Sequence, residues 1–422
     1  MEDPSPAEWK RVHRYASWMH ELRFRIDGKP AFVDTFSKLR LNSPAGGWFP
    51  ALQELSWIIT ESNLPYADLF ILPHLKKVSI YMSWLWRGPN IPHDILPTIT
   101  STISSLPTSA LKSLLVCVDH RRNSWSCFKD SFSSVVLRCG SSLTELNSSI
   151  PLSDAAIDHL IRLPHLRSWS TKGPPPNFPP SSSTLIFPPL TELTLWDNAA
   201  CRWLPLFERL EHSVPTAQPL TPLSRMKESL KLLSAEYNTG SIIDIPFISA
   251  LQIFRNLVTL YIEANCHEKG EEGECTFRLN NDDVAEFAMA LPRMESLLLG
   301  YPCARNTCDT TIACLLQISA YCAKLQELEI HFNTTSIVDD LKDVSEDPRF
   351  QVLRSPPRCT LSCLDVYHMP LILDEPGLET LAHGMIDIFP SLERCEGLNH
   401  VWNDVSRRIT KLQRIRMLPA CC

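Results

Sequence analysis

The sequence is poor in glycine, with 13 Gly against 34 Pro in 422 residues. A phosphate-cradling loop needs closely spaced glycines, and no such loop is present. The G-x-S-x-G, H-E-x-x-H and C-x-x-C motifs of common hydrolases, zinc proteases and zinc sites are also missing. The sequence therefore carries no familiar catalytic motif, and its many prolines predict numerous fixed turns.

Long apolar runs and single-sign charge runs are missing too. No apolar stretch approaches the roughly 18 to 20 residues that span a bilayer, and the polar N-terminus is unlike a signal peptide. The formal charge is −7, from 40 Lys and Arg against 47 Asp and Glu. This balance gives no footprint for nucleic acid or an anionic membrane. We expect a soluble cytoplasmic or nuclear protein whose 15 cysteines are reduced.

What the sequence does contain is a repeated leucine pattern. The motif L-x-x-L-x-L, as in LTELTL (190–195), recurs with first apolar residues at Leu52, Leu75, Leu111, Leu143, Leu166, Leu190, Leu257, Met294, Leu325, Leu361 and Leu392. Most steps between them are 23 to 37 residues, which overlaps the leucine-rich repeat range of about 20 to 29. One step of 67 residues predicts a repeat without this signature between Thr191 and Asn256.

Segments between the motifs have helical patterns. LSDAAIDHLIRL (152–163) opens with Ser153, a good N-cap, and NNDDVAEFAMALPRM (280–294) opens with capping and acidic residues. TTIACLLQISAYCAKL (310–325) and PGLETLAHGMIDIFPSL (376–392) are two further helices, the latter with Pro376 in its first turn. MKESLKLLSAEY (226–237) is also expected to be helical, and NTTSIVDDLKDVSEDPRF (333–350) to be a solvated insertion.

Helix and strand units in alternation predict an α/β fold, a leucine-rich repeat solenoid. It is a curved horseshoe with parallel strands on the concave side and helices on the convex side, because each unit buries its leucines only by stacking on neighbours. An ordinary multilayer α/β protein is the alternative. We expect residues 1–45 to form a helical N-terminal cap or linker, residues 46–400 to form about 10 to 12 irregular repeats, and residues 401–422 to form a C-terminal cap or tail.

Strand alternation predicts which side chains line the concave face. If Leu193 and Leu195 point into the core, their neighbours point outward. The same phase along the chain gives a candidate partner-binding face of Tyr81, Glu192, Thr194, Trp196, Tyr261, Glu263, Glu329, His331, Asp365 and Tyr367. Spaced aromatics among polar residues suit protein recognition, and the carboxylates favour a basic or lysine-rich partner. An exposed sheet with no partner would also favour Tyr and Trp.

Other chemistry has weaker signals. Cys266, His267 and Cys275 lack the spacing of a zinc site, so no metal and no other cofactor is expected. Cys421 and Cys422 match the end that is geranylgeranylated in Rab-type GTPases, but nothing else resembles a GTPase, and no membrane attachment is expected. We expect no enzyme activity; a hydrolase or metal enzyme on an α/β fold is the remote alternative.

The N-terminal segment SPAEWKRVHRYASWMHELRF (5–24) carries a family resemblance. Together with the irregular F-P-x-L-x-x-L repeats, it resembles the fungal, especially basidiomycete, F-box/leucine-rich repeat proteins. In that group a segment S-P-x-x-W-x-R-x-x-x-Y-A links the F-box to the repeats, and the matching residues are Ser5, Pro6, Trp9, Arg11, Tyr15 and Ala16. The resemblance implies a substrate-recognition part of a cullin–RING ubiquitin ligase.

The chain departs from that family at its start. A three-helix F-box should precede Trp9, and eight residues stand there. Binding to the adaptor subunit of the ligase is therefore expected only if an F-box is encoded upstream. A repeat-only scaffold with no ubiquitin-ligase link is the alternative function.

Overall fold

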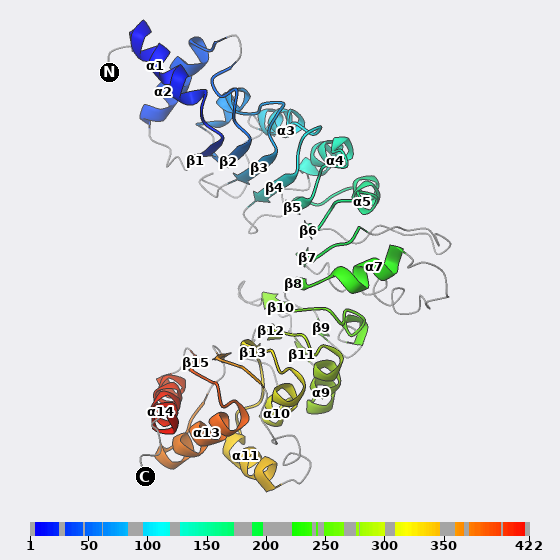
Figure 1. Ribbon diagram of the computed structural model, residues 1–422, viewed down its shortest axis with the longest axis vertical. Helices are drawn as coiled ribbons and strands as arrows, with labels where there is room; N and C mark the ends of the chain where they lie inside the picture. The colour runs from blue at the N-terminus through cyan, green and yellow to red at the C-terminus, as the bar shows by residue number, and fades with distance from the viewer. Residues whose placement is uncertain are drawn as a thin grey trace. The chain divides into compact units, whose positions relative to one another are not determined.

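A computed structural model describes most of the chain. The described residues are 5–24, 30–44, 47–60, 62–82, 96–118, 127–172, 188–196, 222–238, 242–243, 249–265, 276–277, 279–299, 309–346, 359–366, 371–397 and 400–417. They fall into two compact units, unit 1 (Met1–Leu190) and unit 2 (Thr191–Cys422). Each unit is described by itself (Figure 1).

In unit 1 the parallel strands lie side by side in the order of the sequence. They are β1 (Glu21–Phe24), β2 (Glu54–Ile59), β3 (Lys77–Met82), β4 (Ser113–Val118), β5 (Glu145–Ser148) and β6 (Ser168–Thr171). The helices are α1 (Pro6–Ala16), α2 (Pro30–Leu41), the 3-10 helix η1 (Leu64–Leu69), α3 (Leu96–Ser104), α4 (Lys129–Arg138) and α5 (Asp154–Ile161). Helices α3 to α5 lie on one side of the strands (Figure 1).

Unit 2 repeats this arrangement. Its parallel strands are β7 (Glu192–Leu195), β8 (Leu232–Asn238), β10 (Thr259–Asn265), β12 (Ser296–Leu299), β13 (Glu327–Ile330), β14 (Cys363–Asp365) and β15 (Arg394–Glu396). A short parallel pair, β9 (Ile242–Ile243) and β11 (Thr276–Phe277), lies apart from them. The helices are α7 (Pro222–Ser229), α9 (Asn281–Ala290), α10 (Ala313–Tyr321), α11 (Ile337–Glu346), α13 (Glu375–Ile388) and α14 (His400–Met417).

The residue after the first leucine of each motif ties consecutive repeats together. The Lys76 carbonyl accepts the N–H groups of Lys112 (2.7 Å) and Ser113 (3.1 Å). In unit 2 the Lys231 carbonyl accepts those of Val258 (2.8 Å) and Thr259 (2.9 Å). One carbonyl uses both lone pairs, so the ladder starts before the strand and fixes its register.

The motif leucines form the core of each unit. Leu190, Leu193 and Leu195 are fully buried. The register pairs equivalent positions across unit 2: Leu193 with Leu233, then Leu260, Leu297, Leu328, Leu364 and Cys395. Each leucine therefore packs beside its counterpart in the next repeat. The predicted α/β repeat solenoid, with parallel strands along one side and helices along the other, is confirmed.

The helices begin where their capping residues predict. The Ser153 hydroxyl accepts the Ala156 N–H (3.3 Å) at the start of α5. Asn280 forms a reciprocal capping box with Asp283 at α9, accepting its N–H at 3.0 Å and donating to its carboxylate at 2.9 Å. Pro376 lies in the first turn of α13, as expected.

Two sequence expectations are wrong, and one strand was not expected. Residues 226–237 are not one helix: α7 ends at Ser229 and β8 begins at Leu232. Leu230, Leu233 and Ala235 are buried there as a weakened L-x-x-L-x-L, which is the repeat predicted to lack the signature. Residues 333–350 contain the helix α11, whose Ile337 is buried. Strand β1 lies within the segment predicted as a helical cap.

Helix α14 covers the last strand of unit 2. Its Trp402 and Ile409 are fully buried, and the Ser406 hydroxyl accepts the Cys395 N–H of β15 (3.2 Å). Arg408 of α14 bridges Glu375 and Glu379 of α13. No helix within the described ranges is long and apolar enough to cross a membrane.

Candidate protein-binding face on the strands of unit 2

The register of unit 2 sorts the outward side chains into two rows that run across the strands. The first row is Glu192, Leu232, Thr259, Ser296, Glu327, Cys363 and Arg394; the second row is Thr194, Ser234, Tyr261, Leu298, Glu329, Asp365 and Glu396. Neighbouring strands lie about 4.8 Å apart. The side chains of a row are therefore spaced closely enough to contact one ligand.

The predicted site residues take several places in this arrangement. The structure brings together in the second row Thr194, Tyr261, Glu329 and Asp365, all half-buried, and places exposed Glu192 at the end of the first row. Trp196 and His331 follow the ends of β7 and β13 and are half-buried, while Glu263 lies further along β10 and is exposed. Tyr81, 39% exposed, belongs to β3 of unit 1. Tyr367 lies outside the described residues.

Several row members were missed by sequence reasoning. Ser234, Leu298 and Glu396 belong to the second row, and Leu232, Ser296 and Arg394 to the first. The alternation of inward and outward positions along each strand would have identified them. Leu298 follows the inward residue Leu297, just as Glu329 follows the inward residue Leu328. In the last repeat Cys395 replaces the leucine, which hid the equivalence of Glu396 and Asp365.

A hydrogen-bond chain links the two rows. The Ser296 hydroxyl donates to the Glu327 carboxylate (Oγ–Oε2 3.1 Å), and the Tyr261 hydroxyl lies 3.2 Å from Ser296 Oγ. Because Ser296 gives its proton to the carboxylate, Tyr261 is the donor to Ser296. The chain ties the Tyr261 hydroxyl of β10 to Ser296 of β12 and Glu327 of β13.

Glu329 is the electrostatic centre of the second row. Its Oε1 atom is buried and makes no hydrogen bond. Burial first, and then the neighbouring carboxylates of Asp365 and Glu263, together raise the pKa of the Glu329 carboxyl to about 7. The half-buried acid thus titrates near neutral pH, and a positive group placed beside it would favour its ionised form.

The far end of the face carries the one described cation of these rows. Arg394 Nη1 lies 2.8 Å from Glu396 Oε1, so this arginine neutralises the last carboxylate. Burial raises the pKa of the Cys363 thiol, with Arg394 opposing and Glu396, Asp365 and Glu327 adding to the rise. Besides Glu396, the two rows contain the carboxyl groups of Glu192, Glu327, Glu329 and Asp365.

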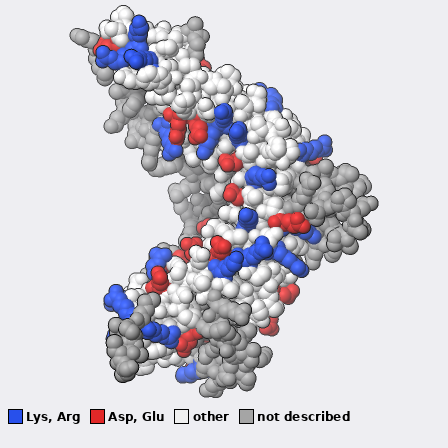
Figure 2. All heavy atoms as spheres, viewed as in Figure 1, with Lys and Arg blue, Asp and Glu red and all other residues white. Residues whose placement is uncertain are grey.

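The strand face of unit 1 differs. Its first row is Glu21, Glu54, Lys77, Ser113, Glu145 and Ser168, and its second row is Arg23, Ser56, Ser79, Leu115, Asn147 and Ser170. The second row contains no carboxylate. In the first row acidic and basic residues are mixed, and Figure 2 shows acidic and basic side chains interleaved over this part of unit 1.

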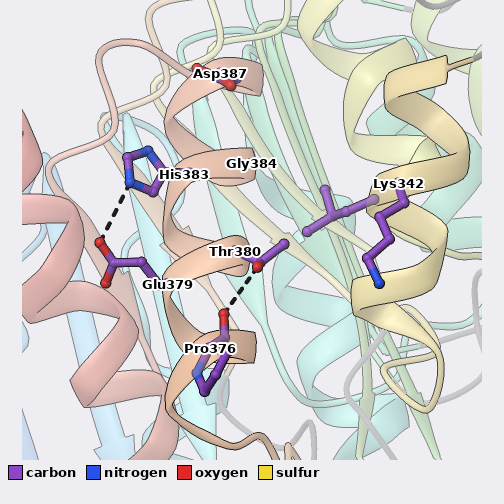
Figure 3. A pocket seen from close by; sticks show the side chains of 8 residues that line it. Lys342, Pro376, Glu379, Thr380, His383, Gly384 and Asp387 are labelled. Carbon is purple, nitrogen blue, oxygen red and sulfur yellow. Dashed lines mark hydrogen bonds and ion pairs between the residues drawn. The ribbon is translucent and has the colours of Figure 1, made fainter.

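A groove of about 590 Å³ lies on the helix side of unit 2, between α11 and α13 (Figure 3). Glu379, His383 and Asp387 of α13 and Lys342 of α11 line it. These groups already serve the fold: Glu379 pairs with Arg408 and His383, and Asp387 with Arg416 at 2.9 Å. The groove therefore offers packed ion pairs between helices rather than a set of groups aimed at a substrate.

The cysteines are placed for packing. Burial raises the pKa of Cys139 and Cys359 to about 11 and that of Cys322 to about 12, so these thiols stay protonated. No group of three or more His, Cys, Asp or Glu side chains in the described part of the chain is placed to hold a metal ion. The segment with Cys266, His267 and Cys275 lies outside the described residues, as do Cys421 and Cys422.

Comparison with known proteins adds no name to this geometry. No model of a protein family matches the sequence, and no curated protein is similar to it.

Proposed function

We propose that this protein is a non-enzymatic protein-binding module and that the strand face of unit 2 holds a basic segment of its partner. The observation that carries the proposal is the second row, where Tyr261, Leu298, Glu329 and Asp365 stand on consecutive strands. It combines two apolar or aromatic surfaces with two carboxylates. Aromatic anchors beside desolvated charges are the composition of binding hot spots.

The chemistry of the row favours lysine or arginine over other ligands. The stem of a long cationic side chain is apolar and suits Tyr261 and Leu298, while its charged end suits Glu329 and Asp365. A cation beside Glu329 would also favour the ionised form of this carboxyl, whose pKa is raised to about 7 by burial and then by Asp365 and Glu263. An acidic or phosphorylated partner would meet like charge on this face instead.

The family resemblance of residues 5–24 supports a more specific role. We propose that the bound partner is a substrate selected for ubiquitination and that the protein is the substrate-recognition part of an F-box-type cullin–RING ubiquitin ligase in the cytoplasm or nucleus. This step rests on the resemblance. Contact with the adaptor subunit needs an F-box upstream.

The binding proposal is tested with a fluorescent lysine-rich peptide and fluorescence anisotropy. The double variant Glu329→Lys/Asp365→Lys should lose at least about tenfold in affinity, because it replaces attraction by repulsion. Glu54→Lys is the matched control, since Glu54 is an exposed glutamate on a strand of unit 1, and it should bind as the wild type does. Equal affinity of the double variant and the wild type would refute the proposed face.

The ligase proposal needs a separate experiment. The full-length gene product, with any upstream exons, should co-purify with the adaptor subunit of the cullin–RING ligase. Failure to co-purify would remove the ligase role and leave the peptide measurement on unit 2 untouched.

A further inference from the structure

The N-terminal helix α1 has two faces with different chemistry. Its inward face packs on Trp48: the ring of Trp9 lies 5.4 Å from that of Trp48, and His13 lies 5.9 Å away. Ala16 on the same face is buried, and the Trp48 indole donates to the Leu39 carbonyl (2.7 Å). These contacts fix the rotation of α1 about its axis, and thus which side chains face solvent.

The outward face is both aromatic and basic. Val12, Tyr15, Trp18 and Met19 are 41%, 59%, 60% and 39% exposed. They are four of the ten large hydrophobic side chains that are exposed among the described residues. Isolated exposed apolar residues are normal, but a contiguous cluster marks an interaction site.

The aromatic pair is held in a defined geometry. Tyr15 and Trp18 meet edge to face, with ring centroids 6.1 Å apart at 84°, and the Arg14 guanidinium lies over the Trp18 ring at 5.3 Å. The backbone N–H of Trp18 donates to the Tyr15 carbonyl at 3.1 Å and so continues the helical turn past the end of α1. Rigid Trp, Tyr and Arg side chains lose little entropy on binding, which is why they are frequent in hot spots.

The charge around this pair is positive. Lys10, Arg11 and Arg14 are exposed on α1, and Figure 2 shows basic side chains gathered over this helix. The nearby carboxylate, Glu8, is held in the capping box with Ser5, whose hydrogen bonds lower the Glu8 pKa. The patch formed by Lys10, Arg11, Arg14, Tyr15 and Trp18, here called the cap patch, is thus complementary to negative charge.

We propose that the cap patch binds an acidic peptide segment of a partner protein, with carboxylates on the cations and one bulky apolar side chain against Tyr15 and Trp18. Two guanidinium groups favour carboxylates, which they pair with in a planar, bidentate manner. An anionic membrane is less well matched, because recruitment to such a surface uses clusters of roughly four to eight Lys and Arg. This site is in unit 1 and independent of the strand face of unit 2.

A random-peptide phage library selected on the full-length chain tests the proposal. Selection should yield a class of sequences rich in Asp and Glu around a Leu, Phe or Trp. A synthetic peptide of that class should bind Trp18→Ala and Arg11→Glu/Arg14→Glu at least about tenfold more weakly than the wild type. The matched controls Leu137→Ala, an exposed apolar residue of α4, and Arg255→Glu, an exposed arginine of unit 2, should bind unchanged.

Three results would overturn the proposal. The first is a selection with no acidic class. The second is an acidic class whose binding is unaffected by the cap-patch variants, all confirmed as folded by circular dichroism. The third is that Trp18 controls a different association: co-sedimentation with phosphatidylserine vesicles would indicate a membrane site, and concentration-dependent self-association would indicate a second copy of the chain.

Discussion

Ser79 in unit 1 and Glu329 in unit 2 occupy equivalent positions, each the third residue of a strand with a parallel neighbour on both sides. Ser79 is 7% exposed, and its row contains no carboxylate. Glu329 is half-buried in a row that adds Asp365 and Glu396. The backbone ladder is the same in both units, so the outward positions are free to differ while the inward leucines are not. The fold is set by one side of each strand, and specificity by the other.

The first way to test this comparison is to truncate the buried leucines that both units share. Leu114→Ala in unit 1 and Leu193→Ala in unit 2 remove fully buried side chains at equivalent motif positions. Each should cost about 2 to 5 kcal/mol of unfolding free energy, measured by urea denaturation. Trp196→Ala, at a half-buried outward position, should cost far less. Equal destabilisation by Leu193→Ala and Trp196→Ala would contradict the assigned strand phase.

The second way is to move the chemistry of unit 2 into unit 1. Ser79→Glu places a carboxylate at a buried outward position and should cost at least about 2 kcal/mol, because the charge loses its hydration. Ser234→Glu makes the same change in the second row of unit 2, where Ser234 is half-buried, and should cost less than about 1 kcal/mol. Urea midpoints compare the two. A Ser234→Glu variant as unstable as Ser79→Glu would show that the second row of unit 2 does not tolerate an added carboxylate better than unit 1 does.

The inward side of the strands was predictable from sequence, because buried positions recur at a regular spacing of apolar residues. Leu190, Leu193 and Leu195 predicted their burial through spacing alone, and the caps at Ser153 and Asn280 predicted two helix starts. Prediction failed where the pattern was diluted. In β8 an alanine stands at the third motif position, and Met226, Leu230 and Leu233 have the i, i+4, i+7 spacing of one helix face.

For the candidate site, the sequence predicted which side chains point outward but not the pKa of Glu329. Parity correctly separated Glu192 from Leu193 and Tyr261 from Leu260. The raised pKa of Glu329 was not predictable, because it depends first on burial in the folded sheet, then on Asp365 of the neighbouring strand and on Glu263, two strands away. The cap patch was missed for a related reason. Which face of α1 is exposed depends on Trp48, far along the chain, and not on the helix itself.

Helix capping provides a third, smaller comparison. Ser153 of unit 1 makes one cap bond at 3.3 Å, whereas Asn280 of unit 2 accepts two, at 2.8 and 3.0 Å, within a reciprocal box. Asn280→Ala should cost about 1 kcal/mol of unfolding free energy, and Ser153→Ala about half of that. Denaturant titration of both variants checks the ranking. The reverse order would indicate that the stability of α5 depends on its cap more than on its buried apolar face.

The smallest predicted effect is a pH dependence of stability that Glu329 gives to unit 2. Because the Glu329 pKa is raised from 4.5 to about 7, the folded state keeps a proton that the unfolded state has lost between these values. Stability contributed by this residue therefore falls as pH rises through that window and stays low above it. Glu329→Gln should be more stable than the wild type above about pH 8 and indistinguishable from it near pH 4. Asp365→Asn, which removes a neighbouring charge, should lower the folded-state pKa of Glu329 and so narrow this pH window from its upper end.

Peptide affinity should change with pH in the opposite direction to stability. Raising the pH through about 7 ionises Glu329, so the affinity of the wild type for a lysine-rich peptide should rise by roughly two- to fivefold, less than one tenfold step in the binding constant. Glu329→Gln should lose this rise and keep the lower affinity throughout, since its amide cannot ionise. Anisotropy titrations at a series of pH values, with Glu54→Gln in unit 1 as the control, measure the difference. A wild-type affinity that is flat across this range would mean that the partner does not contact the second row at Glu329, and the basic segment would then have to be held by Glu327 and the first row instead.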